Sequence, residues 1–315
     1  MISEELKIQC DRRREELEND VEYQTSMSDL RSTVNQYARI QRDRMRVGNQ
    51  IKVKKTGGSQ KVPDGQVQYQ VSPEQKLFNT ETYNRSIAEE KRVLKRITSL
   101  VEKSPVYTRY LVNIPGVGPS TAAVLLSQFV PEKVYYVSNM FSFAGIVAGK
   151  DKLRKGEKAS FNTFLRAKLI GVMGVNFIKQ KSDYAIYYCN KRMQLINRDR
   201  VLIDAGEMNP SFVHNDKYGM DRPTAAHHSR MATRYMVQRF VRDYYVAFRT
   251  IMDIPVVPPY EEAYLALKHV GTTYTSADTF LDRNPKDDGS RQSTQSDVKN
   301  LSEVLKSMLI QNGYA

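Results

Sequence analysis

Two glycines and two hydroxyl residues stand close together between two apolar stretches, at residues 116–121. Gly116 and Gly118 can adopt backbone conformations that other residues avoid, and they let another molecule approach the backbone closely. Ser120 and Thr121 follow where a helix is expected to begin, and unpaired N–H groups and the helix dipole attract an anion there. We therefore predict a small socket for one phosphate group, formed by Gly116, Val117, Gly118, Ser120 and Thr121.

This socket requires two helices joined by a tight turn. Apolar residues before and after the turn predict such a pair over residues 106–129, and Pro131 closes the second helix. The same pattern also suits a tight turn inside an apolar core, which needs no ligand. The two interpretations differ in whether the turn touches another molecule.

Basic residues are concentrated directly after this turn. The chain of 315 residues has a formal net charge of +13, and residues 150–200 hold thirteen Lys and Arg against four Asp and Glu. A local excess of this size predicts a polyanionic partner, and neutralised phosphates would supply much of the affinity. The candidate contacts are Lys150, Lys152, Arg154, Lys155, Lys158, Arg166 and Lys168.

The sequence gives little support for a metal site, a cofactor site or a membrane segment. Cys10 and Cys189 lie far apart, and neither they nor the four scattered histidines have the spacing of metal ligands, so we expect no metal and no cofactor. The N-terminus has no apolar signal core, and no apolar run reaches membrane-spanning length. We expect a cytoplasmic, nucleoid-associated protein of prokaryotic or phage origin with no membrane partner.

The N-terminal part of the chain has the pattern of long helices. Residues 1–52 form an amphipathic region, residues 53–73 a loop or hinge rich in Gly and Pro, and helical periodicity resumes at residue 74. The stripe beginning at Leu6 predicts either a coiled coil that makes a homo-oligomer or a helical hairpin that folds back on residues 74–103. Both alternatives remain open at this level.

The remaining segments favour a mainly α fold in which the long N-terminal helices precede a helical domain at residues 74–270. A helix is expected from Asn162 towards Arg192, a loop from Asp204 to Pro223, and a last long helix capped by Thr224. Residues 271–300 read as a flexible tail and residues 301–315 as a short helix.

Residues 82–269 resemble the C-terminal helix-hairpin-helix domain of an insertion-sequence transposase family, whose relatives include bridge-RNA-guided recombinases. Three blocks in order carry the resemblance: residues 111–126; residues 141–146, 154–158 and 162–169; and residues 227–240 with 258–260. Members of this family pair a RuvC-like nuclease domain, bearing four acidic metal ligands, with a helical domain that supplies a serine nucleophile. The resemblance implies a scaffold that grips double-stranded DNA.

The chain departs from the family at the two parts that carry out its chemistry, the nuclease domain and the serine nucleophile. Residues 1–100 show no alternating strands and no acids at strand ends, so the nuclease domain is expected to be missing. The interval at residues 147–153, where the family places its serine, contains none, and Ser160 is a weak substitute farther along. A serine nucleophile also needs an activating base or metal.

These observations favour a sequence-tolerant double-stranded DNA-binding protein, a non-catalytic derivative of such a transposase from a mobile element or phage. One alternative is an active recombinase or transposase with a relocated nucleophile, and another is a structural or scaffold protein of a phage or mobile element. RNA remains an alternative to DNA as the polyanionic partner. The sequence leaves enzymatic activity uncertain, and its departures from the family favour a protein without such activity.

Overall fold

A computed structural model describes residues 3–52, 72–147, 158–205, 213–215, 221–223 and 225–257. Over these residues the chain is mainly helical, as the sequence predicts. The expected loop at residues 204–223 also contains two short antiparallel strands, β1 (Val213–Asn215) and β2 (Asp221–Pro223). Strands of three residues are too short for an alternating pattern to reveal them. The predicted tail at 271–300 and the helix at 301–315 lie outside the described residues.

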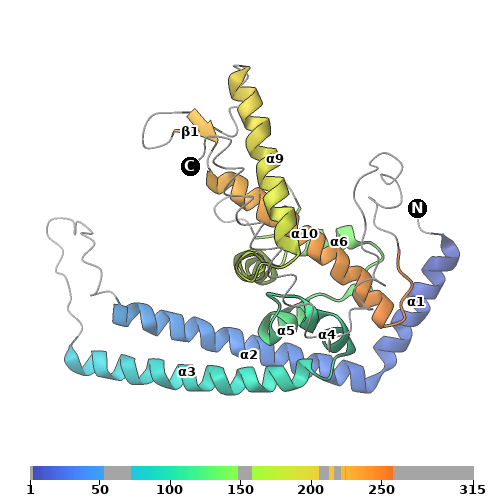
Figure 1. The fold of residues 1–315 in the computed structure, drawn as a ribbon. Coiled ribbons are helices and arrows are strands. Elements are labelled where there is room, and N and C mark those ends of the chain that lie inside the picture. The colour runs from blue at the N-terminus through green and yellow to red at the C-terminus, as the bar shows by residue number, and fades with distance from the viewer. Residues whose placement is uncertain are drawn as a thin grey trace, which may run out of the picture.

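The first helical stretch is divided into α1 (Glu4–Asn19) and α2 (Val21–Lys52), which meet at an angle (Figure 1). The side chain of Ser3 caps α1 by accepting from the N–H of Leu6. Asp20 has an extended backbone, and its carboxylate accepts from the N–H of Tyr23 at 2.9 Å. Asp20 therefore ends one helix and caps the next.

The second long helix, α3 (Pro73–Val101), begins at Ser72, whose hydroxyl accepts from the N–H of Gln75. It runs antiparallel beside α2, and the two form a long arm (Figure 1). Buried residues of α3, such as Ile97, belong to the same apolar cluster as Leu30 and Val34 of α2. Of the two alternatives, the structure shows the helical hairpin. The apolar stripe of α2 is therefore no longer an argument for a dimer.

The predicted helical pair is present, but its first helix is short. α4 (Pro105–Arg109) and the 3₁₀ turn η1 (Leu111–Asn113) precede the turn, and α5 (Pro119–Gln128) follows it. α5 packs against both α2 and α3, and its residues 121–127 are all buried. The turn η2 (Pro131–Lys133) and α6 (Val137–Phe143) come next.

The helix expected from Asn162 to Arg192 is interrupted. Asn162 caps α7 (Thr163–Arg166), which continues through a π-helical segment, η3 (Ala167–Met173), into α8 (Gly174–Lys179). Lys181 then adopts φ +52°, and the N–H of Ser182 donates to the carbonyl of Phe177. This left-handed residue with a six-to-one hydrogen bond ends the helix as a Schellman motif does. The chain restarts as α9 (Tyr184–Asp204).

The last described helix, α10 (Ala225–Ile251), passes through the centre of the molecule and packs along α9 (Figure 1). It supplies fully buried aromatic residues, among them Phe240 and Tyr244, to an apolar cluster that extends from Leu17 to Ile254. The N-terminal helices and the helical pair thus share one core. No helix in the described part of the chain is both long and apolar enough to cross a membrane.

Candidate phosphate-binding site

The turn between η1 and α5 places its two glycines in different environments. Gly116 has φ +97°, a conformation that favours glycine, so the expected special backbone is confirmed there. Gly118 has φ −92° and ψ 174°, which any residue adopts, and it is the N-cap of α5. Val117 between them is buried, and its N–H donates to the carbonyl of Ile114. Only Gly116 is required by backbone conformation.

The surroundings of the two glycines differ as well. A Cβ on Gly116 would lie 3.1 Å from backbone atoms of Asn176 and Phe177, so this glycine lets the turn pack closely on α8. A Cβ on Gly118 would have no neighbouring atom within 4 Å. Gly116 therefore fits the core-turn interpretation, whereas Gly118 is exposed and open to another molecule.

The start of α5 has free hydrogen-bond donors. The N–H groups of Thr121 and Ala122 both donate to the carbonyl of Gly118, and the Thr121 hydroxyl donates to the same oxygen at 2.9 Å. Among the described residues, the N–H groups of Gly118 and Ser120 have no hydrogen-bond partner. Pro119 between them has no N–H to offer. Two donors at the positive end of the α5 dipole are thus available to an anion.

A cavity of about 380 Å³ adjoins this helix start. Ser120 and Thr121 lie on the wall made by α5, and Phe164 and Lys168 lie on the wall made by α7 and η3. The remaining wall belongs mainly to α2, with Tyr37, Gln41 and Arg44, and Ile97 of α3 completes it. The cavity therefore brings Ser120, Thr121 and Lys168, which the sequence analysis predicted as contacts, together with residues from the N-terminal hairpin.

Lys168 is a half-buried cation in this mainly apolar cavity. Its Nζ donates to Oε1 of Gln41 at 3.0 Å and lies 5.7 Å from the centre of the Phe164 ring. Burial lowers the pKa of Lys168, while Glu90 opposes the shift. No carboxylate of a described residue lies within ion-pair distance of Lys168. Glu90 thus acts on Lys168 only from beyond ion-pair distance, and the ammonium can still bind an anion. Lys168 also lies on a π-helical segment, a geometry often found at functional sites.

The α2 wall is held in place by a polar network. Nε2 of Gln41 donates to Glu90 of α3 at 3.0 Å, and Arg44 forms an ion pair with the same carboxylate at 2.5 Å. Glu90 thus compensates Arg44 and fixes the amide of Gln41, whose oxygen faces Lys168. No local motif in the sequence indicates that α2 returns to the helical pair, so the sequence did not predict the roles of Gln41, Arg44 and Glu90.

The other predicted basic contacts are placed differently. Arg166 donates to the carbonyl of Gly145 and lies 5.1 Å from the centre of the Phe161 ring, so it supports the connection between α6 and α7. Lys158 is exposed just before α7. The four remaining residues fall outside the described part of the chain: Lys150, Lys152, Arg154 and Lys155.

The candidate nucleophile Ser160 is exposed. Within the described residues, no histidine or carboxylate forms a hydrogen bond with Ser160, and no cluster of three or more His, Cys, Asp or Glu is placed to hold a metal ion. Tyr107, another conceivable nucleophile, is buried, and this burial, together with Glu102, raises the pKa of its phenol. None of the described groups would activate a nucleophile at these positions.

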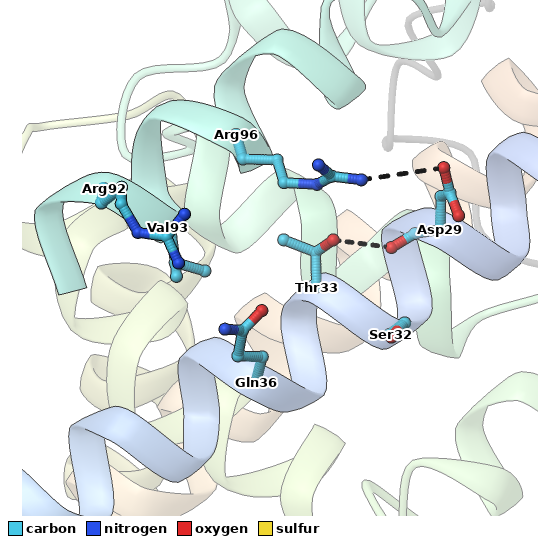
Figure 2. A pocket seen from close by; sticks show the side chains of 7 residues that line it. All are labelled: Asp29, Ser32, Thr33, Gln36, Arg92, Val93 and Arg96. Atoms are coloured by element: carbon cyan, nitrogen blue, oxygen red, sulfur yellow. Dashed lines mark hydrogen bonds and ion pairs between the residues drawn. The ribbon is translucent and has the colours of Figure 1, made fainter. Parts of the chain in front are cut away.

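A second groove, of about 250 Å³, lies between α2 and α3 on the arm (Figure 2). Its arginines have acidic neighbours: Arg96 reaches Asp29 at 4.0 Å, and Arg92 pairs with Glu89 at 2.6 Å. The Thr33 hydroxyl donates to the backbone carbonyl of Asp29. Since these positive charges are compensated, this groove is a weaker candidate for an anion than the cavity at Lys168.

Comparisons of this chain with protein-family models, with curated proteins and with solved structures found no match.

Proposed function

We propose that this chain is a sequence-tolerant DNA-binding protein that grips the phosphate backbone of double-stranded DNA, a non-catalytic derivative of a transposase. One observation carries the proposal: Ser120, whose N–H group is unpaired, and Lys168, whose ammonium has no ion-pair partner among the described residues, line the same cavity. Backbone N–H groups at a helix start and lysine side chains are both common ligands of phosphate. Contacts of this kind position a duplex without reading its bases.

The basic run that ends at Lys158 supports the same function. It directly precedes α7 in the sequence, and α7 and η3 form one wall of the cavity. Each additional phosphate that it neutralises would add affinity that depends on salt and not on base sequence. Such a protein would be associated with the nucleoid of a prokaryotic cell, or with the DNA of a phage.

Gly118→Asp tests the proposal at the α5 start. The position is open and has the extended backbone of an N-cap, so aspartate fits and caps the helix. Its carboxylate would occupy the free donors and repel a phosphate. We expect unchanged or slightly increased thermal stability and about a tenfold loss of affinity for a short fluorescein-labelled duplex, measured by fluorescence anisotropy, which corresponds to about 1.4 kcal/mol.

Gly118→Ala is the matched control, because it adds a Cβ without a charge and should bind DNA nearly as well as the original protein. At the opposite wall, Lys168→Gln should also weaken binding, whereas Lys179→Gln, which removes an exposed charge from α8, should have a small effect. If both charge-changing variants, Gly118→Asp and Lys168→Gln, bind the duplex unchanged, the cavity is not the phosphate site.

A further inference from the structure

We infer that the cavity beside Lys168 receives one unpaired nucleotide of DNA, with its phosphate at the α5 start and Lys168 and its base against the apolar wall. This inference rests on the proposed function, because it assigns the chemical class of ligand to the same site. It adds a preference for DNA that contains an unpaired base.

The apolar wall is the first argument for a base. Besides its polar residues, the cavity is lined by apolar side chains, among them Val34, Ile97, Val124 and Val172. A phosphate group gains nothing from these surfaces, since apolar walls favour ligands that bury apolar area. A ligand that matches both parts of the cavity carries an anion at one end and a flat apolar group at the other.

The aromatic residues are the second argument. Phe164 is half-buried on one wall, and Tyr37 is half-buried on the wall made by α2. Burial raises the pKa of the Tyr37 phenol, and the neighbouring Glu90 carboxylate raises it further. Stacking of a base on an aromatic ring is worth about 1–3 kcal/mol and tolerates every base. That property agrees with a protein that does not read sequence.

The geometry of duplex DNA explains why the base must be unpaired. In an intact duplex the bases are stacked inside the helix, and a protein reaches one in a pocket only after it has left the stack. A base that is already unpaired avoids most of that unstacking energy. A bulge, a gap or a strand junction would therefore fill the apolar part of the cavity, which an intact duplex leaves empty.

The test compares the binding of the full-length protein to two DNA duplexes. The first is fully paired, and the second has the same sequence with a single extra, unpaired 2-aminopurine nucleotide in one strand. We expect the bulged duplex to bind about tenfold more tightly, consistent with one stacked base. The fluorescence of 2-aminopurine should change on binding, because stacking alters its emission. Both signals should saturate at the same protein concentration.

Two variants examine the pocket itself. Val172→Phe places a ring in the cavity and should abolish the preference for the bulge. Val175→Phe is the matched control: Val172 and Val175 are 37% and 38% exposed, but only Val172 lines the cavity. Phe164→Leu keeps most of the packing, removes the ring, and should lower the preference severalfold.

The outcomes separate this inference from the function on which it rests. Equal affinity for the two duplexes, or a bulge preference that Val172→Phe leaves intact, overturns the nucleotide pocket and leaves duplex binding standing. A tighter bulged complex with unchanged 2-aminopurine fluorescence also overturns the pocket, since the base then stays outside. Absence of binding to either duplex overturns both proposals.

Discussion

Nζ of Lys168 donates a hydrogen bond to Oε1 of Gln41 at 3.0 Å, joining residues that are 127 positions apart in the chain. Gln41 lies on α2, and its amide nitrogen donates to Glu90 on α3. The orientation of the amide is therefore set by the hairpin arm, and its oxygen is presented to the lysine. The proposed phosphate site is thus assembled from the arm and the helical pair together.

Gln41→Glu should weaken DNA binding without removing a basic residue. The new carboxylate would add a second negative charge beside Lys168, next to Glu90, to which it could no longer donate a hydrogen bond. We expect duplex affinity to fall about fivefold at low salt, as an ion pair of about 1 kcal/mol would produce. Gln36→Glu, an exposed position on the same helix, serves as the control and should bind nearly as the original protein does. Equal losses in the two variants would indicate general repulsion instead.

Gly116→Ala and Gly118→Ala should differ in stability. Alanine at 116 would be strained by φ +97° and crowded by the backbone of α8, so we expect a loss of about 1–3 kcal/mol in the free energy of unfolding. Alanine at 118 has an allowed backbone and open space, so it should lose only the advantage of glycine over alanine at an N-cap, about 1 kcal/mol or less. Urea unfolding measures both. Similar values for the two variants would contradict the close packing of Gly116 on α8.

Arg249 is expected to be the most sensitive charged residue for stability. Its side chain is fully buried and donates to the carbonyls of Pro131, Val134 and Pro255, while Nη2 lies 2.9 Å from Sγ of Cys10. Arg249→Met would leave these acceptors unpaired and lower the free energy of unfolding by about 2–4 kcal/mol.

The control for Arg249 is Arg230→Met, at an exposed position on the same helix, where the change should be below about 0.5 kcal/mol. Thermal unfolding followed by circular dichroism suits both variants. If Arg249→Met unfolds at the same temperature as the control, the buried network does not hold α1 to the end of α10.

The buried pair of Asp199 and His228 should make stability depend on pH. Burial would raise the pKa of Asp199, but hydrogen bonds from His228 at 2.5 Å and from Arg198 outweigh it and lower the pKa below 3.8. A carboxyl whose pKa is lowered in the folded state stabilises the fold above its unfolded pKa. This contribution is lost as the pH falls through the folded pKa.

Asp199→Asn should therefore lower the free energy of unfolding by about 1–3 kcal/mol near neutral pH, because the hydrogen bonds to the charged form are lost. The difference from the original protein should shrink as the pH falls below the ordinary range of a carboxyl group. Asp253→Asn, at an exposed position, is the control. A difference that is the same at every pH would show that the lowered pKa of Asp199 is not its source.

The helical periodicities and end signals predicted much of the fold from the sequence. The stripe in residues 74–103 and the closing Pro131 correspond to α3 and to the end of α5, since both depend on nearby residues. The breaks at Asp20 and Lys181 were missed. Each depends on a single side-chain cap or a left-handed residue, which an amphipathic pattern does not reveal.

The candidate site was predictable only in part. The turn and Lys168 were found because composition and spacing mark them within a short segment. Gln41 and Tyr37 were not, since their role arises from the return of the arm over the helical pair. The sequence correctly predicted that Gly116 has a backbone conformation that favours glycine. Its close packing against the backbone of α8 could not be predicted from sequence spacing.

We predict that the protein alone neither cuts nor joins DNA. Ser160 has no described base beside it, and the turn supplies donors for a phosphate but no nucleophile. Incubation of supercoiled plasmid with the protein and Mg²⁺ or Mn²⁺ should leave the plasmid supercoiled and free of covalently attached protein. Reproducible nicking that disappears in Ser160→Ala would instead support the recombinase alternative.

The most direct test of the central claim is duplex affinity measured across a salt series. If about four to eight phosphates are contacted, log K should fall against log[salt] with a slope of about −4 to −7. Replacing Lys150, Lys152, Arg154, Lys155 and Lys158 by neutral residues should flatten the slope by several units. The control replaces five lysines elsewhere in the chain, Lys76, Lys91, Lys95, Lys103 and Lys133, and should change it less. A slope near zero in the original protein would contradict DNA binding.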